Sequence, residues 1–192
     1  MTMAFDSTQK RTIQEVLEWY VFQVEVLGRE KARVLNELAS AAFPSDSRFF
    51  EMGNKEIEDF FHLHKNELDF VTMLVMMAAA EATVRLDFME RVDRRWRDAV
   101  SKAFKAIHKD LSKKDAADRV RLEEDILDTC AATDERTKGP IGDFKGALKL
   151  RHWLAHGRYW NDVQMGRRQY SPQDVFDISN NLLQAIDETK AK

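Results

Sequence analysis

Apolar side chains recur every three or four residues along most of this chain, and that spacing restricts the fold more than any other feature. From Asn54 to about Val92 it continues without interruption, which is the pattern of one long helix. Only 7 glycines and 3 prolines occur in 192 residues, so few positions force the chain to turn. No alternating apolar and polar segment of useful length indicates a strand. The sequence therefore predicts an all-α helical bundle of five or six helices.

The N-terminal segment predicts a separate long helix. Apolar positions keep the helical spacing from Ile13 onwards, Asp6 or Ser7 is suited to be the N-cap, and Pro44 would end the helix. Residues 1–43 are therefore expected to form a long N-terminal helix within a single domain that covers residues 1–192. A chain of this length is sufficient to bury a substantial core.

Four shorter helices are expected in the second half of the chain, over residues 94–111, 115–132, 142–156 and 172–188. The polar segment 133–140 ends in a Gly-Pro pair and predicts a loop. Gly157 is placed to end the third of these helices as a left-handed C′ residue. Ser171 and Pro172 favour the N-cap and the first position of the last one.

Composition restricts the class of protein. The formal net charge of −3 gives no overall attraction to nucleic acid, so any such binding needs a local basic patch. Cys130 is the only cysteine, which excludes an internal disulfide and a thiol-rich zinc motif.

The most apolar window, residues 70–80, is too short to span a bilayer, and no secretory signal is visible. We expect a cytoplasmic protein without a membrane partner, in which this window is a buried helix. The basic segment 91–114 is interpreted as a solvated helix face in preference to an RNA-facing strip.

The densest group of reactive side chains is the stretch LKLRHWLAHGRYW, which starts at Leu148. When its residues are placed at about 100° intervals around a helix, Arg151 falls inside the apolar arc. His152 and His156 lie at the edge of that arc, where the polar face begins. The stretch therefore combines a cation directed toward the core with two imidazoles near solvent.

An arginine that faces a core is costly unless a carboxylate or a phosphate meets it. The long second helix carries Glu81 and Arg85 one turn apart on its apolar arc. Glu81 is therefore the expected internal partner of Arg151.

The two histidines also have the four-residue spacing of zinc ligands on a helix. However, Trp153 stands where metalloproteases of that pattern have their glutamate base, and no third ligand is evident. We therefore expect no metal and no cofactor.

Arg151, four residues and His156 together resemble the signature of the HEPN ribonuclease superfamily, the higher eukaryote and prokaryote nucleotide-binding domains. The longer run LRHWLAHGRYW is similar to the HEPN branch found in bacterial toxin and phage-defence systems. The Glu81 and Arg85 pair in AAAEATVRLDF also resembles that branch. The resemblance covers roughly residues 54–188, and the first helix adds nothing specific to it.

The resemblance implies a HEPN-like bundle and metal-independent endonuclease activity on RNA, with two motifs meeting across a homodimer. Arg151 and His156 would be catalytic, and His152, Glu81 and Arg85 would support them. A histidine with a pKa of about 6.5 can move the proton of a ribose 2′-OH, and an arginine can hold the phosphate. The implied role is that of a toxin or antiviral defence effector that cuts single-stranded or tRNA-like RNA. An antitoxin or a larger defence complex would be its protein partner.

Cations and aromatic rings alternate just after the motif, at Arg158, Tyr159, Trp160, Arg167 and Arg168. Rings stack on unpaired bases and arginines contact the backbone, so these residues are candidates for RNA binding. A segment that its own aromatic side chains fix onto the bundle is an equally good interpretation. Some HEPN toxins carry a modifiable tyrosine two residues after the motif histidine, whereas here that position is Arg158 and the tyrosine follows it.

A second function from a different class stays open. A catalytically inactive chain of this fold would serve as a dimerisation module, or as a nucleotide-binding or RNA-binding module, in a larger complex. The pair of Arg151 and His156 favours the endoribonuclease, because a scaffold needs neither residue.

Overall fold

The computed structural model describes residues 10–40, 43–94, 96–114, 119–158 and 169–190, and in these ranges it contains six α-helices and no strand. The prediction of an all-α fold of five or six helices is thus confirmed. The helices are α1 Ile13–Ala39, α2 Asn54–Asp93, α3 Ala99–Ser112, α4 Asp128–Thr133, α5 Lys138–Ala155 and α6 Pro172–Asp187. A π-helical turn, η1 Leu122–Leu127, leads into α4, and a 3-10 turn, η2 Glu135–Thr137, leads into α5.

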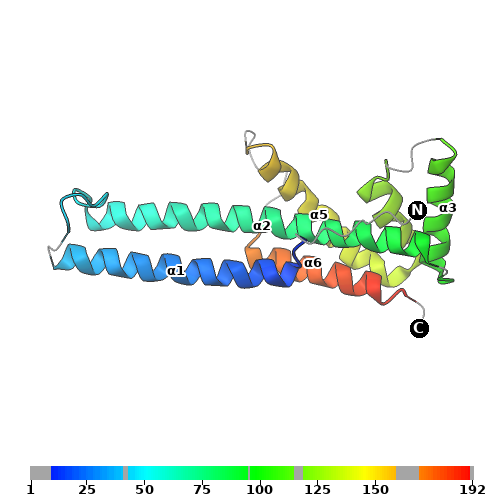
Figure 1. Cartoon of the computed structure of the whole chain (residues 1–192), viewed down its shortest axis with the longest axis horizontal. Coiled ribbons are helices and arrows are strands. Elements are labelled where there is room, and N and C mark those ends of the chain that lie inside the picture. Colours follow the sequence, from blue (N-terminus) through cyan, green and yellow to red (C-terminus); the bar gives the residue numbers. More distant parts are fainter. Residues whose placement is uncertain (1–9, 41–42, 95, 115–118, 159–168, 191–192) are drawn as a thin grey trace.

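Helices α1 and α2 form a long antiparallel hairpin (Figure 1). The other helices pack around the second half of α2, so the tip of the hairpin extends beyond the rest of the bundle. Nearer the bundle, Tyr20 of α1 donates a hydrogen bond to Asp69 of α2 over 2.7 Å. The tip has a small apolar core of its own, which contains Val34, Phe49, Ile57 and Phe61.

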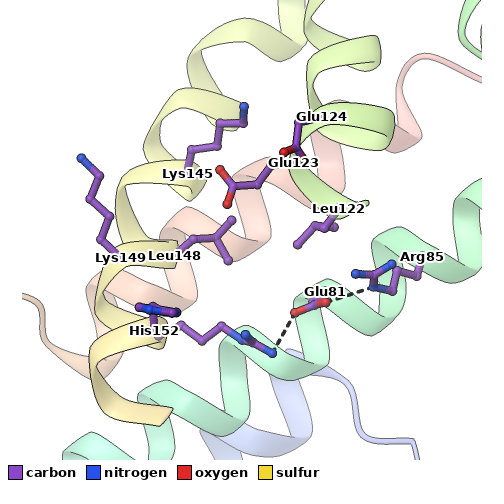
Figure 2. Close-up of a pocket in the computed structure, with 10 residues that line it drawn as sticks. Glu81, Arg85, Leu122, Glu123, Glu124, Lys145, Leu148, Lys149 and His152 are labelled. Atoms are coloured by element: carbon purple, nitrogen blue, oxygen red, sulfur yellow. Dashed lines mark hydrogen bonds and ion pairs between the residues drawn. The ribbon is translucent and has the colours of Figure 1, made fainter. Parts of the chain in front are cut away.

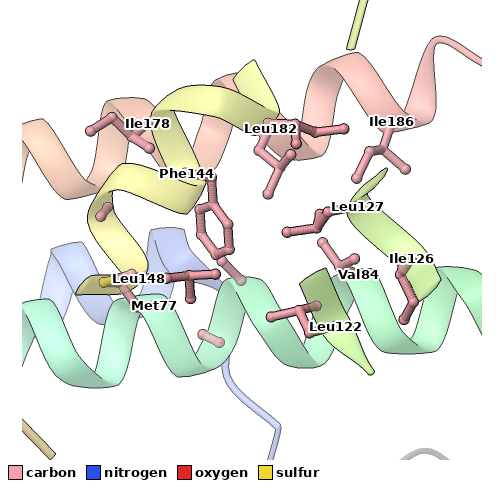
Figure 3. Packing of buried hydrophobic residues seen from close by; sticks show 14 of the residues in the cluster. Met77, Val84, Leu122, Ile126, Leu127, Phe144, Leu148, Ile178, Leu182 and Ile186 are labelled. Atoms are coloured by element: carbon pink, nitrogen blue, oxygen red, sulfur yellow. The ribbon is translucent and has the colours of Figure 1, made fainter. Parts of the chain in front are cut away.

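The main core lies between the second half of α2 and the helices α3 to α6, and the start of α1 also reaches it. Met73, Met76 and Met77 of α2 are almost completely buried there. Phe144 of α5 and Leu182 of α6 belong to the same cluster (Figure 3). Unbranched methionine side chains fill such irregular spaces between helices well.

The apolar window 70–80 is buried on one side only. It lies within α2, and its residues Val71 and Val75 are 49% and 39% exposed. The expectation of a helix buried throughout this window is therefore wrong, because none of the described helices covers that face of α2. Across the described ranges, no helix combines the length and the apolar character needed to cross a membrane.

The first helix begins later than its sequence pattern predicts. Thr12 and Glu15 form a capping box, in which the hydroxyl of Thr12 accepts from the backbone N–H of Glu15 and the Glu15 carboxylate accepts from that of Thr12. These two bonds satisfy groups that a helix start leaves without partners, so α1 begins at Ile13. The N-cap candidates Asp6 and Ser7 lie outside the described residues.

The expected loop at 133–140 is wrong for most of its length. Part of it forms η2, and α5 already begins at Lys138 rather than near position 142. Pro140 is the third residue of α5, where its missing N–H is not needed, because the first N–H groups of a helix have no partner within it. The start of the last helix is confirmed, with Ser171 as N-cap and Pro172 as the first residue of α6.

The first residue of the basic segment, Arg91, is not solvated. Its side chain is 0% exposed, and it donates to Asp87 over 2.6 Å and to Asp98 over 3.0 Å. It also donates to the carbonyl oxygen of Ile186 and to the hydroxyl of Thr189, both over 2.9 Å. The interpretation of this segment as a solvated face is wrong at Arg91, because these oxygens replace water around it. The network joins the end of α2 to the start of α3 and the end of α6.

Candidate functional site

The motif stretch occupies the last turns of α5, and two backbone hydrogen bonds fix their end. The N–H of Gly157 donates to the carbonyl of Leu154 over 3.3 Å, and the N–H of Arg158 donates to that of Trp153 over 3.1 Å. This pair of bonds is the Schellman arrangement. Gly157 has a φ of 78°, which confirms the expected C′ residue. His156 is therefore the C-cap of a well-defined helix end.

Arg151 lies between α5 and α2 and pairs with the carboxylate expected to meet it. Its Nη2 is 3.1 Å from Oε2 of Glu81, and its side chain is 38% exposed. The expected ion pair is confirmed, although Arg151 lies at the edge of the core rather than inside it. Its Nε–H is buried and has no hydrogen-bond partner among the described residues. A buried donor of this kind is unfavourable until an acceptor reaches it.

Glu81 serves two arginines at once (Figure 2). Its Oε1 accepts from Nε of Arg85 over 3.0 Å, while Arg85 also donates to the backbone carbonyl of Val120 over 3.0 Å. The carboxylate thus orients Arg151 without neutralising both cations. Within this group of three side chains one positive charge is left over, which favours an anionic ligand beside Arg151.

A cavity of about 680 Å³ opens between α2, η1 and α5 beside this ion pair (Figure 2). Arg151 and His152 line it, and so do Lys145 and Lys149. Its size is in the range of sites that bind small molecules. The sequence pattern did not predict the two lysines as site residues. Their spacing from His152 places all three on one face of α5, and that spacing was the signal that could have found them.

The opposite wall of the cavity comes from a segment that no sequence spacing connects with the motif. Leu122, Glu123 and Glu124 of η1 line the cavity together with residues of α5. They reach it because η1 packs against α2 and the core, which is a tertiary contact. The sequence gives no local signal for such a wall.

His156 is exposed and is not among the described residues that line the cavity. Its ring centroid lies 4.2 Å from that of His152, with 57° between the ring planes. Residues five positions apart on a helix are about 140° apart, so α5 directs Arg151 and His156 to different sides. One chain therefore brings Arg151, Glu81, Arg85 and His152 together but leaves His156 away from Arg151.

Arg158 is held against the bundle. Its guanidinium donates to both carboxylate oxygens of Glu67, over 2.8 and 2.9 Å, and these bonds lower the pKa of Glu67. It also lies 5.0 Å from the ring centroid of Phe70, which meets Trp153 edge-on. Of the two interpretations of this segment, these contacts favour the one in which Arg158 fixes it onto the bundle. They do not favour the one in which Arg158 is open to bind RNA. The other candidates of this segment lie outside the described residues: Tyr159, Trp160, Arg167 and Arg168.

Cys130 is not placed to act as a nucleophile. It is fully buried in the main core, and burial raises the pKa of its thiol to about 12. The thiol therefore stays protonated near neutral pH, and a protonated thiol is a poor nucleophile.

Guanidinium and ammonium groups can bind a phosphate and imidazoles can transfer protons, and the candidate site contains both kinds of group. Comparison with known proteins gives no match: no family model, curated protein or solved structure is significantly similar to this chain. The chemistry of the site and the sequence motif are therefore the basis for a functional proposal.

Proposed function

We propose that this protein is a metal-independent endoribonuclease of the HEPN type. The observation that carries the proposal is the setting of Arg151. Glu81 holds its guanidinium over 3.1 Å at the edge of a cavity, while its buried Nε–H has no acceptor among the described residues. A phosphate in the cavity would meet the exposed part of this guanidinium, and a small turn of the side chain would bring the Nε–H within its reach. His152 lines the same cavity, and His156 lies against His152.

The proposed reaction uses the 2′-hydroxyl of the RNA itself. The 2′ oxygen attacks the adjacent phosphorus and the bond from phosphorus to the 5′ oxygen breaks, which leaves a 2′,3′-cyclic phosphate and a 5′-hydroxyl. One group takes the proton of the 2′-hydroxyl, and another gives a proton to the departing 5′ oxygen. His156 is proposed to make one of these two proton transfers, and solvent water makes the other. Arg151 binds the phosphate and opposes the charge that grows in the transition state.

A homodimer completes this site in the proposal. A two-fold axis near the end of α5 would place His156 of one chain opposite Arg151 of its partner, which one chain alone does not achieve. Val71 and Val75 of α2 offer exposed apolar surface for such a contact. They follow Phe70, which packs against the motif stretch.

The biological role that we propose is that of a toxin or antiphage defence effector acting on single-stranded or tRNA-like RNA. The similarity of LRHWLAHGRYW to the corresponding HEPN branch supports this role, as does the pair of Glu81 and Arg85. An antitoxin or a larger defence complex is part of the same proposal.

The alternative is a catalytically inactive module for dimerisation or for nucleotide binding. The ion pairs of Glu81 with Arg151 and Arg85 join two helices, so they stabilise the bundle whether or not a reaction takes place. The distance of His156 from the cavity in one chain also favours this alternative.

Incubation of the purified full chain with total RNA, followed by mapping of the new ends, tests the proposal. The wild type should produce defined fragments, and Arg151→Ala should not. Arg29→Ala is the matched control, because this arginine of α1 has a side chain that is 74% exposed and should not affect cleavage. Intact RNA after incubation with the folded wild type would reject the nuclease and favour the binding module.

A further inference from the structure

The cavity between α2, η1 and α5 has walls of opposite charge. Lys149, Arg151 and His152 come from α5, whereas Glu123 and Glu124 come from η1. At about 680 Å³ the cavity has room for a whole nucleotide rather than a phosphate group alone. The acidic wall would repel a phosphate, so it has no part in phosphate binding. It must meet a different portion of any ligand that fills the cavity.

The α5 wall is suited to the phosphate. Arg151 lines the cavity with a side chain that is 38% exposed, and its Nε–H has no acceptor in the described part of the chain. Lys149 is exposed one turn before His152 on the same side of α5. Lys145 is less available, because its Nζ lies 2.7 Å from a carboxylate oxygen of Asp128. A phosphate held by Arg151 and Lys149 leaves the rest of the cavity to the attached nucleoside.

Two leucines provide the apolar surface that a nucleobase needs. Leu122 of η1 is 8% exposed and Leu148 of α5 is 9% exposed, and both line the cavity. Figure 2 shows them between Glu123 and Glu81. A flat base that lies on these side chains loses contact with water on one face, which is favourable. The hydrogen-bonding edge of a base in this position is close to η1.

Glu123 is the acceptor that can read this edge. Glu124 has a cationic neighbour, since Nη1 of Arg121 lies 3.6 Å from its carboxylate, whereas no described residue pairs with the side chain of Glu123. A carboxylate accepts two parallel N–H bonds. The Watson–Crick edge of guanine presents two adjacent donors, N1–H and the 2-amino group. Adenine and cytosine place a ring nitrogen acceptor beside their amino group, and this acceptor repels a carboxylate.

We infer that this cavity binds a guanine nucleotide, with the phosphate on Arg151 and Lys149 and the edge of the base on Glu123. The inference rests on the proposed binding of an RNA phosphate at Arg151. It makes Glu123 the residue that determines specificity for guanosine next to the bond that is cut.

Titration calorimetry of the full chain with guanosine 3′-monophosphate and adenosine 3′-monophosphate tests this inference. Neither nucleotide contains a bond that the reaction would cut, so binding is measured whether or not the protein cleaves RNA. The guanosine nucleotide should bind about 10-fold more tightly or better, as expected for one bidentate contact to a base. Glu123→Gln keeps the size of the side chain but replaces one acceptor oxygen with a donor, so it should remove most of this preference. Glu135→Gln on η2 makes the same change at a side chain that is 82% exposed, and it should keep the preference.

Equal affinity for the two nucleotides, or a preference that survives in Glu123→Gln, would overturn the inference. The absence of binding by either nucleotide would overturn it as well. A guanine preference in a chain that leaves RNA intact would support the inference while removing the nuclease. Cleavage of RNA without a guanine preference would support the nuclease and overturn the inference about guanine.

Discussion

Arg91 belongs to α2 and Arg151 of α5 packs against that helix, and the two arginines differ in how completely the protein satisfies their hydrogen-bond donors. Arg91 is fully buried, and all five of its N–H groups have an oxygen within hydrogen-bonding distance. Arg151 is partly exposed, shares one carboxylate with Arg85, and keeps a buried Nε–H without a partner in the described chain. The first arginine has no capacity left for a ligand, whereas the side chain of the second lines a cavity and has a donor to spare.

The contacts of Arg91 connect it with stability, and those of Arg151 connect it with function. A fully paired, buried guanidinium holds helices together, and its loss leaves carboxylates buried without a counter-charge. Replacement of Arg151, which has an unsatisfied donor and lies at the edge of a cavity, should cost the fold little stability. Glu81 keeps Arg85 as its partner. The comparison therefore predicts opposite outcomes for stability and activity at the two positions.

The largest expected effect is the loss of stability in Arg91→Leu. Removal of this guanidinium leaves Asp98 without a cationic partner and Asp87 with Lys190 alone, which should lower the free energy of unfolding by about 3–5 kcal/mol. Urea unfolding monitored by circular dichroism measures the change. Arg94→Leu is the matched control, because Arg94 pairs with Glu90 at a side chain that is 61% exposed and should cost less than about 1 kcal/mol. Equal stability of the two variants would contradict the structural role of Arg91.

His156→Ala should show the reverse pattern. The cleavage rate should fall by about 100-fold to 10,000-fold, as expected when a proton-transfer group is removed. Because His156 is exposed at the C-cap, the melting temperature should stay within a few degrees of the wild type. Single-turnover cleavage and thermal unfolding give the two quantities. A variant that unfolds would show that this histidine is structural.

Arg151→Ala should reduce cleavage by about 100-fold to 1,000-fold, as expected when one charged donor at the transition state is lost. The free energy of unfolding should change by less than about 2 kcal/mol, because Arg151 is partly exposed and Glu81 stays paired. A loss of stability as large as that of Arg91→Leu would remove the contrast between the two arginines.

A mixture of Arg151→Ala and His156→Ala tests whether the two residues act across a homodimer. In a heterodimer, one of the two sites combines the intact His156 of the first variant with the intact Arg151 of the second. Mixing and refolding the two inactive variants should therefore restore part of the activity. No recovery, in a mixture that forms heterodimers, would place both groups in one chain or reject the reaction.

The smallest expected effect concerns acid stability near Arg91. Burial opposes the charged form of Asp98, but hydrogen bonds from Ser101 and the charge of Arg91 outweigh it, so the pKa of Asp98 is lowered. A lowered pKa means that this carboxylate stabilises the fold above its unfolded pKa and stops doing so as the pH falls through its folded pKa. The stability difference between the wild type and Asp98→Asn should therefore be constant near neutral pH and shrink in acid. A difference that grows in acid would contradict the sign of this shift.

Local patterns were sufficient to predict much of the fold. The continuous apolar spacing predicted α2 within a residue or two, and Gly157 and Ser171 marked helix ends because their backbone and side-chain chemistry acts over a few residues. The partnership of Glu81 and Arg151 followed from the cost of an unpaired arginine near a core.

What could not be predicted depends on contacts between distant segments. Arg91 looked solvated because two of its partners, Ile186 in α6 and Thr189 just after it, are 95 or more positions away in the sequence. Glu123 reaches the cavity only because η1 packs against α2, and no spacing within either segment indicates this. The exposure of Val71 has the same origin, since a helical pattern does not reveal which face lacks a neighbour.

The most direct test of the central claim, that Arg151 and His156 cut RNA through the ribose 2′-hydroxyl, is a cleavage assay in excess EDTA. Its substrates are a mapped RNA and the same RNA with one 2′-deoxy nucleotide at the cut site. Because a histidine moves the proton and an arginine stabilises the phosphate, the normal RNA should be cut at an unchanged rate. Its products should end in a 2′,3′-cyclic phosphate and a 5′-hydroxyl, and the substituted RNA should stay intact. Loss of cleavage in EDTA that added zinc restores, or cleavage of the substituted RNA to a 5′-phosphate, would contradict the account, because a metal-bound hydroxide would then be the nucleophile.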